Sequence, residues 1–155
     1  MIKYAEKSET EELKRLFNVC FPGEESFCSW IFENIYKPEN TLIDVKDGVL
    51  RGSAMELPYK IKGIGDVTYL YAVGTFPEFR GKRICGNIIN YSRENDSRKG
   101  RAASVLIPGN KSLFEFYRKL GYRESSFVSE RRFTAENIDS SGFCTGNCRP
   151  SELIK

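Results

Sequence analysis

Residues 73–87 read Val-Gly-Thr-Phe-Pro-Glu-Phe-Arg-Gly-Lys-Arg-Ile-Cys-Gly-Asn. The apolar run 67–73 before this stretch predicts a buried strand, and the pattern after it predicts a helix from about Lys82 to Arg98. A helix N-terminus offers unpaired N–H groups and the positive end of the helix dipole, while glycine lets a ligand approach the backbone. The stretch therefore predicts a phosphate site, with a basic loop that merely caps a helix as the structural alternative.

Positive charge is concentrated around this turn. The chain of 155 residues has 24 Lys plus Arg against 21 Asp plus Glu, a net charge of +3. From Arg80 to Arg101, seven cationic residues face only Glu94 and Asp96, which leaves +5. A local anion site fits this distribution better than a nucleic-acid surface, because aromatic residues do not alternate with the basic ones as a stacking platform requires. The strict P-loop and dinucleotide-binding patterns are absent.

Composition excludes several other classes of protein. With no His, the chain has no Ser-His-Asp or Cys-His nucleophile pair and no His-containing metal site, and we predict no bound metal. No apolar run approaches the roughly 20 residues of a membrane helix, and the N-terminus lacks the apolar core of a signal peptide. Five cysteines without a secretion signal predict free thiols in the cytoplasm. The spacing of Cys144 and Cys148 is not that of a typical zinc or redox motif.

The N-terminal half predicts one strand, two helices and then three strands. Ser8 and Glu11 have the spacing of a capping box, which predicts a helix from Ser8 to about Cys20. Asp47-Gly48 is typical of a two-residue hairpin turn. The other predicted elements are a strand at 2–5, a helix at 25–36 that buries Phe27, Ile31, Phe32 and Ile35, and strands at 41–46, 49–57 and 67–73.

The C-terminal part predicts a strand, a helix and a strand. Residues 102–107 read as a buried strand, and Asn110 is a good N-cap for a short helix over 111–119. Residues 122–133 predict a long strand. We expect residues 1–134 to form one α/β domain. Residues 135–155 are then a tail, an edge strand or the start of a further region.

The central turn resembles a known signature. Residues 77–86 read Pro-Glu-Phe-Arg-Gly-Lys-Arg-Ile-Cys-Gly and are similar to the acyl-CoA signature of the GNAT superfamily of N-acetyltransferases. That signature has Arg or Gln, two residues, Gly, one residue, and then Gly or Ala. Arg80 matches its first position, whereas Arg83 stands where Gly is usual and Cys85 where Gly or Ala is usual.

A second stretch strengthens the resemblance. Residues 110–122 resemble the family's Asn, short helix, Tyr-x-x-Leu-Gly-Phe/Tyr signature, and one helix and one strand separate the two signatures as the family requires. The resemblance covers about residues 1–133 and implies the GNAT acyl-CoA N-acyltransferase fold, a mixed central sheet flanked by helices. The Val-Gly-Thr-Phe-Pro lead is similar to the enhanced-intracellular-survival branch of the superfamily.

The resemblance implies a site for acetyl-CoA, the cosubstrate. The pantetheine arm would pair with the strand from Tyr71 through Val73 to Thr75, and the backbone near Val73 would donate to the thioester carbonyl, as in an oxyanion hole. Asn110 would contact the coenzyme, or act only as an N-cap, and Tyr117 would protonate the leaving thiolate, or serve only as a core residue. The pyrophosphate would lie on the turn formed by Arg80, Gly81, Lys82, Arg83, Ile84, Cys85, Gly86 and Asn87.

The base and the acceptor are less defined by the sequence. An alkyl amine has a pKa near 10.4, so a base must take its proton, and the catalytic candidate by position is Glu56, with Tyr69, Tyr71, Glu24 and Glu25 as further candidates. The acceptor is a small amine, an aminoglycoside-like polyamine or a peptide N-terminus, and the protein a monomer or homodimer. The alternatives to an enzyme are a non-catalytic acyl-CoA sensor on the same fold and a nucleic-acid-binding domain. We expect neither a nucleic-acid nor a membrane partner.

Overall fold

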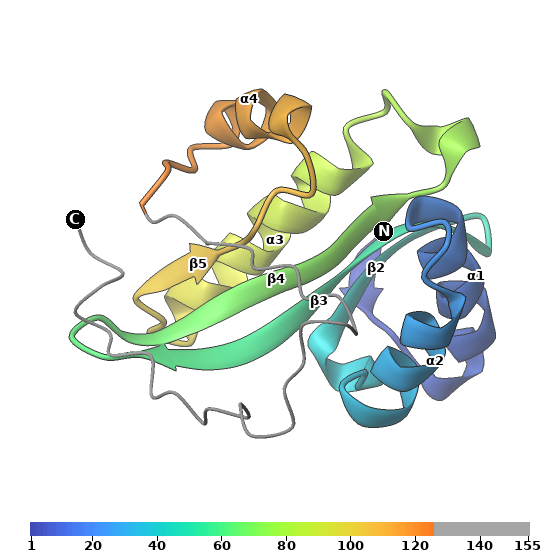
Figure 1. Ribbon diagram of the computed structural model, residues 1–155, viewed down its shortest axis with the longest axis horizontal. Helices are drawn as coiled ribbons and strands as arrows, with labels where there is room; N and C mark the ends of the chain where they lie inside the picture. The colour runs from blue at the N-terminus through green and yellow to red at the C-terminus, as the bar shows by residue number, and fades with distance from the viewer. Residues whose placement is uncertain (126–155) are drawn as a thin grey trace, which may run out of the picture. The chain divides into compact units, whose positions relative to one another are not determined.

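The computed structural model describes residues 1–125, whose strands form one mixed sheet (Figure 1). The chain divides into two compact units, Met1–Phe114 and Glu115–Lys155. The main elements in chain order are β1 (Ile2–Tyr4), α1 (Thr10–Cys20), α2 (Glu25–Asn34), β2 (Thr41–Lys46), β3 (Val49–Ile61), β4 (Gly65–Thr75), α3 (Ile84–Arg98), β5 (Ala103–Val105) and α4 (Lys111–Lys119).

The sheet has the order β1-β2-β3-β4-β5, which follows the chain. The first three pairings are antiparallel, and β4 pairs with β5 in parallel, so α3 is the crossover between two parallel strands. The predicted hairpin between β2 and β3 is confirmed: Asp47 and Gly48 have φ of +52° and +78°, as a turn with two left-handed residues requires. Both β3 and β4 run longer than predicted and meet at a second hairpin.

Two apolar clusters lie on opposite faces of the sheet, because side chains alternate along each strand. Ile43 of β2 packs with Leu13 and Leu16 of α1, whereas its neighbour Leu42 packs with Ile84 and Ile88 of α3. Helices α1 and α2 therefore cover one face and α3 covers the other (Figure 1). The predicted mixed α/β sheet flanked by helices is confirmed. Within residues 1–125, no helix has both the length and the apolar character needed to cross a membrane.

Two details of the N-terminal helices differ from prediction. The reciprocal cap involves Glu6 and Glu9 rather than Ser8 and Glu11, since the N–H of Glu6 donates to Oε2 of Glu9 at 2.7 Å and α1 begins at Thr10. A short 3-10 turn before α1 causes this shift of register. In α2 the buried side chains are Cys28 and Ile31, and the helix ends at Asn34 instead of Tyr36.

Phe27 was predicted to be buried but is 42% exposed. Its ring stacks on that of Trp30 at a centroid distance of 5.9 Å, and both side chains point outward from α2. The prediction was wrong because α2 touches α1 through a narrow stripe that Cys28 and Ile31 fill. A helix with apolar residues all around does not reveal from sequence which stripe is buried.

The C-terminal predictions also need correction. Strand β5 spans only Ala103–Val105 and is half-buried, where a buried strand over 102–107 was predicted, because it is the last strand of the described sheet and pairs on one side only. Residues 122–125 are not in a strand. The rest of the strand predicted at 122–133, the proposed domain end at residue 134 and the segment 135–155 lie outside the described residues.

Close backbone packing at Gly52 gives a testable prediction of stability. A Cβ atom there would lie 2.8 Å from the carbonyl oxygen of Gly74, 2.9 Å from Cγ2 of Ile84 and 3.0 Å from Oγ1 of Thr75. We expect Gly52→Ala to lower the free energy of unfolding by about 1–3 kcal/mol through overpacking. Urea unfolding measures this loss, and Gly109→Ala is the control because a Cβ there meets nothing within 4 Å. Equal midpoints for the two variants would contradict the packing described here.

Candidate functional site

The turn after β4 is held by buried residues at both of its ends. Phe76 is 1% exposed, and its N–H donates to a carbonyl of β3 at 3.0 Å. The 3-10 helix η3 (Pro77–Phe79) follows, and the buried Ile84 begins α3. Between them Gly81 and Arg83 have φ of +78° and +59°. The chain thus enters α3 through two left-handed residues, and α3 begins at Ile84 instead of Lys82 because Arg83 is its N-cap.

The first turn of α3 presents backbone donors. The first bond into the helix runs from the N–H of Asn87 to the carbonyl of Arg83 at 2.9 Å. Within residues 1–125, no group accepts a hydrogen bond from the N–H groups of Ile84, Cys85 and Gly86. These are the orphan donors of a helix N-terminus, where the helix dipole also favours an anion.

The side chains around these donors are basic and exposed. Arg80, Lys82 and Arg83 all lie at the surface. Arg80 Nε donates to the carbonyl of Thr75 at 3.3 Å, and Lys82 Nζ lies 5.1 Å from the centroid of the Phe79 ring. A Cβ on Gly81 would meet nothing within 4 Å, so this side of the turn is open. Three cationic side chains and three orphan N–H groups fit a pyrophosphate.

Cys85 is tied to the end of β4 rather than exposed for reaction. Its Sγ lies 2.9 Å from Oγ1 of Thr75, and burial raises the pKa of the Cys85 thiol. Thr75 also receives the Sγ–H of Cys20 on its carbonyl oxygen at 3.6 Å. A raised pKa keeps the thiol protonated at neutral pH, so Cys85 acts here as a small residue that packs against β4.

Strand β4 contains a bulge that the sequence did not reveal. Its pairing with β3 shifts between Ser53 and Met55, and Ala72 has a φ of +48°. The bulge changes the face to which the following side chains point. Tyr71 lies on the face of α1 and α2, whereas Val73 packs with the cluster on α3, and Thr75 contacts Cys85 of α3. Bulges of this kind are over-represented next to active sites, where they re-aim side chains.

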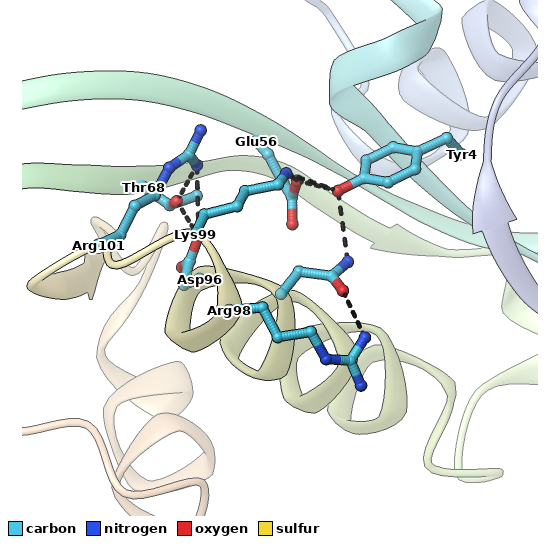
Figure 2. Close-up of polar contacts among 8 residues, drawn as sticks. Tyr4, Glu56, Thr68, Asp96, Arg98, Lys99 and Arg101 are labelled. Atoms are coloured by element: carbon cyan, nitrogen blue, oxygen red, sulfur yellow. Dashed lines mark hydrogen bonds and ion pairs between the residues drawn. The ribbon is translucent and has the colours of Figure 1, made fainter.

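Glu56, the predicted catalytic carboxylate, is buried on the α3 face of the sheet (Figure 2). It is 3% exposed, and its Oε2 accepts a hydrogen bond from the Tyr4 hydroxyl at 2.9 Å and lies 3.9 Å from Nζ of Lys99. Asn95 of α3 also donates to the Tyr4 hydroxyl, at 3.3 Å. Alternation along the paired strands puts Glu56 on the opposite face from Tyr71. These contacts support a structural role, and a catalytic role for Glu56 stays a prediction.

The two roles of Glu56 can be separated by experiment. We expect Glu56→Gln to lower the free energy of unfolding by about 1–3 kcal/mol, since it disturbs a buried charge-assisted network, and to leave kcat within about twofold. Urea unfolding and initial rates at saturating substrates measure the two effects, with the exposed Glu94→Gln as control. A kcat about 100-fold lower at unchanged stability would instead make Glu56 a general base.

Asn110 and Tyr117 lie on the segment around α4. Oδ1 of Asn110 accepts hydrogen bonds from the N–H groups of Ser112 and Leu113 at 3.1 and 3.3 Å, so the predicted N-cap is confirmed. Tyr117 is 8% exposed, and its ring lies 5.8 Å from that of Tyr122. A role of Asn110 in binding the coenzyme and of Tyr117 in proton transfer stays a prediction.

The cysteines carry no separate site. Cys28 is buried and Cys20 is partly buried on the α1 face of the sheet, and both are free thiols, as is Cys85. In the described part of the chain, no group of three or more Cys, Asp or Glu residues is arranged to hold a metal ion. Cys144 and Cys148 lie outside the described residues.

Tyr69 and Tyr71 lie together on the face of α1 and α2. Their ring centroids are 6.0 Å apart, and the negative charge of Glu24 contributes to raising the pKa of Tyr71, although burial contributes most. The structure thus brings three of the predicted base candidates to one face of the sheet, and it places Glu56 on the other. Tyr59, which the sequence did not single out, extends this group.

Comparisons with known proteins agree with this architecture. A family model described as an acetyltransferase (GNAT) domain matches residues 1–125. No curated protein sequence matches the chain. Glucosamine-6-phosphate N-acetyltransferase from Arabidopsis thaliana is similar with a TM-score of 0.63 and 18% identity, over 86% of this chain and 98% of that one.

Two further solved structures share the fold. An aminoglycoside N-acetyltransferase in complex with CoA has a TM-score of 0.70 and 20% identity, over 86% of this chain and 93% of that one. An acetyltransferase from Trypanosoma brucei has a TM-score of 0.61 and 21% identity, over 86% and 96% of the two chains. These structures confirm the predicted fold, whereas the assignment to the enhanced-intracellular-survival branch stays a prediction.

Proposed function

Because the chain belongs to the GNAT acetyltransferase family, we propose that it is an N-acetyltransferase that moves an acetyl group from acetyl-CoA to a primary amine by direct attack in a ternary complex. The observation that carries the proposal is the bulged strand β4 followed by a turn that leaves the N–H groups of Ile84, Cys85 and Gly86 without acceptors in the described chain. Backbone donors at that place suit a ligand with a pyrophosphate.

We assign the coenzyme to the residues that line this path. The backbone of Tyr71, Val73 and Thr75 would hold the pantetheine arm, and Asn110 would add a contact. The turn from Arg80 to Asn87 would hold the pyrophosphate, with the side chains of Arg80, Lys82 and Arg83 adding charge. Arg83 replaces the usual glycine but adopts the left-handed conformation itself, at a cost of about 1–2 kcal/mol, so the departure from the signature does not close the turn.

Different residues of the chain would then carry out the separate steps of the acetyl transfer. When bound, acetyl-CoA supplies the thioester that the amine attacks. The backbone near Val73 would donate to the carbonyl oxygen as negative charge develops there. A water held by Glu24, on the α1 and α2 face, would take the amine proton while the new C–N bond forms. Tyr117 would give its proton to the sulfur as the C–S bond breaks, and solvent would restore it.

The acceptor is proposed to be a small-molecule amine. The Arabidopsis thaliana structure and the aminoglycoside enzyme are both named for amino sugars, and both share this fold.

The free thiols Cys20, Cys28 and Cys85 are consistent with a reducing, cytoplasmic location.

Calorimetric titration with acetyl-CoA tests the proposal, with ATP and a short DNA duplex as controls. We expect selective binding of acetyl-CoA in the micromolar range, followed by turnover on an amine panel. Binding without turnover on any amine would support the acyl-CoA sensor instead. Binding of DNA with a steep salt dependence and no affinity for acetyl-CoA would overturn the assignment.

A further inference from the structure

We propose that Tyr59, Tyr69 and Tyr71 form a binding row for a linear aliphatic polyamine, so that the acceptor carries a second ammonium group beyond the one that is acetylated. This row is called the tyrosine ladder below. The inference rests on the proposed function, because it takes Tyr71 as the end of the ladder nearest the reacting amine.

The ladder is a continuous row of rings on one face of the sheet. The centroids of Tyr59 and Tyr69 are 6.1 Å apart at an interplanar angle of 82°, and those of Tyr69 and Tyr71 are 6.0 Å apart at 47°. Tyr69 and Tyr71 are two residues apart on β4, so both side chains point to the same face, and Tyr59 lies next to them on β3. The row begins one residue before the bulge at Ala72 and runs away from it toward the β3–β4 hairpin.

The ladder does not serve the core. Tyr59 is 61% exposed, and Tyr69 and Tyr71 are only half-buried. Within residues 1–125, no group hydrogen-bonds to the hydroxyls of these three residues. Three tyrosines whose hydroxyls stay available and whose rings stay partly open form a surface that a ligand can use, whereas buried tyrosines usually have a hydrogen-bond partner.

The charge of the ladder suits a cation. Burial raises the pKa of Tyr69 and of Tyr71, so both phenols stay neutral at neutral pH and keep ring faces that attract an ammonium group. Glu24, from the loop before α2, is close enough for its charge to contribute to the raised pKa of Tyr71. A carboxylate at the inner end and neutral rings along the row complement a chain with several positive charges.

The spacing of the rings sets the length of the ligand. With C–C and C–N bonds of about 1.5 Å, the two nitrogens of an extended four-carbon diamine lie roughly 6 Å apart. That separation matches one step of the ladder, 6.0 or 6.1 Å between centroids. A two-carbon diamine is too short to reach from one ring to the next, and a monoamine uses only the inner end.

Steady-state rates with n-butylamine, ethane-1,2-diamine, butane-1,4-diamine and a lysine-containing dipeptide test the inference. We expect the KM for butane-1,4-diamine to be about 10-fold below the KM for each of the other amines, consistent with one or two cation–π contacts. Tyr69→Leu should raise the KM for butane-1,4-diamine about 10-fold and leave the KM for n-butylamine unchanged. Tyr69→Phe should keep the preference, because it keeps the ring.

Ile64→Ser, at an exposed position near the hairpin tip, is the matched control for loss of surface apolar area. Equal KM values for mono- and diamine, a preference for the dipeptide, or a Tyr69→Leu variant that weakens all amines equally would overturn the ladder. Direct calorimetry with butane-1,4-diamine separates this result from the proposed function. Tyr69-dependent binding without acetylation would leave the ladder in place and refute the N-acetyltransferase.

Discussion

Gly81→Asp is expected to weaken acetyl-CoA binding by about 100-fold or more while the fold remains intact. Gly81 has a φ of +78°, which costs a residue with a side chain roughly 1–2 kcal/mol, but the Cβ of the new side chain would meet nothing within 4 Å. Its carboxylate, however, would lie beside the proposed pyrophosphate. Two like charges about 5 Å apart repel by roughly 3 kcal/mol near a protein surface, which corresponds to a factor of about 100 in affinity.

Gly81→Asn is the matched control for this variant. Asn has almost the shape of Asp, carries no charge and tolerates the left-handed conformation better than most residues. We expect its dissociation constant for acetyl-CoA to stay within about fivefold of the original by calorimetry. Similar affinities for the Asp variant and the unmodified protein would place the pyrophosphate elsewhere. A similar loss in both variants would mean that the backbone conformation, and not charge, limits binding.

Tyr117→Phe is expected to lower kcat about 100-fold and to change the KM for acetyl-CoA by less than about threefold, as loss of a general acid does. The expectation depends on the proposed proton transfer to the leaving thiolate. Because the side chain is buried, with its ring 5.8 Å from Tyr122, replacing Tyr by Phe keeps the packing. Stopped-time assays of thiol release at saturating amine measure the change.

Two controls make the Tyr117 test specific. Tyr122→Phe removes a neighbouring hydroxyl from the same aromatic group and should keep kcat within about twofold. A thiol with a pKa far below the usual value of about 8.5 leaves without help from an acid. With an acetyl thioester of such a thiol, Tyr117→Phe should therefore lower kcat only slightly. An unchanged kcat with acetyl-CoA would leave Tyr117 as a packing residue, and an equal loss with both thioesters would point to misplacement of the substrate.

The fold was largely predictable because local signals and packing agree over most of the chain. Asp47-Gly48 favours φ above zero at both positions, and the hairpin forms there. The apolar run at 67–73 and the Gly-rich basic turn after it predicted β4 and the N-terminus of α3 within a few residues. Such signals span only a few neighbouring residues, so they can be recognised in a single sequence.

Other features depend on contacts that no local pattern encodes. Alanine shows no preference for a positive φ, so nothing in the sequence marks the bulge at Ala72. Phe27 is apolar but exposed, because the contact between α1 and α2 decides which stripe of α2 is buried. Glu56 was a candidate base by its position along the strand. The sequence did not show that its side chain points to the α3 face of the sheet, where it contacts Tyr4 and Lys99.

The bulge at Ala72 turns the side chains of the two halves of β4 toward opposite faces of the sheet. Before it, Tyr69 and Tyr71 point to one side of the sheet; after it, Val73 and Thr75 point to the other side, toward α3 and the turn proposed to bind the coenzyme. Residues that share no partners can change without disturbing each other. Under the proposed function, substitutions at Tyr69 and Tyr71 can therefore change acceptor preference without disturbing the residues proposed to bind the coenzyme, as long as the extra residue at position 72 is retained.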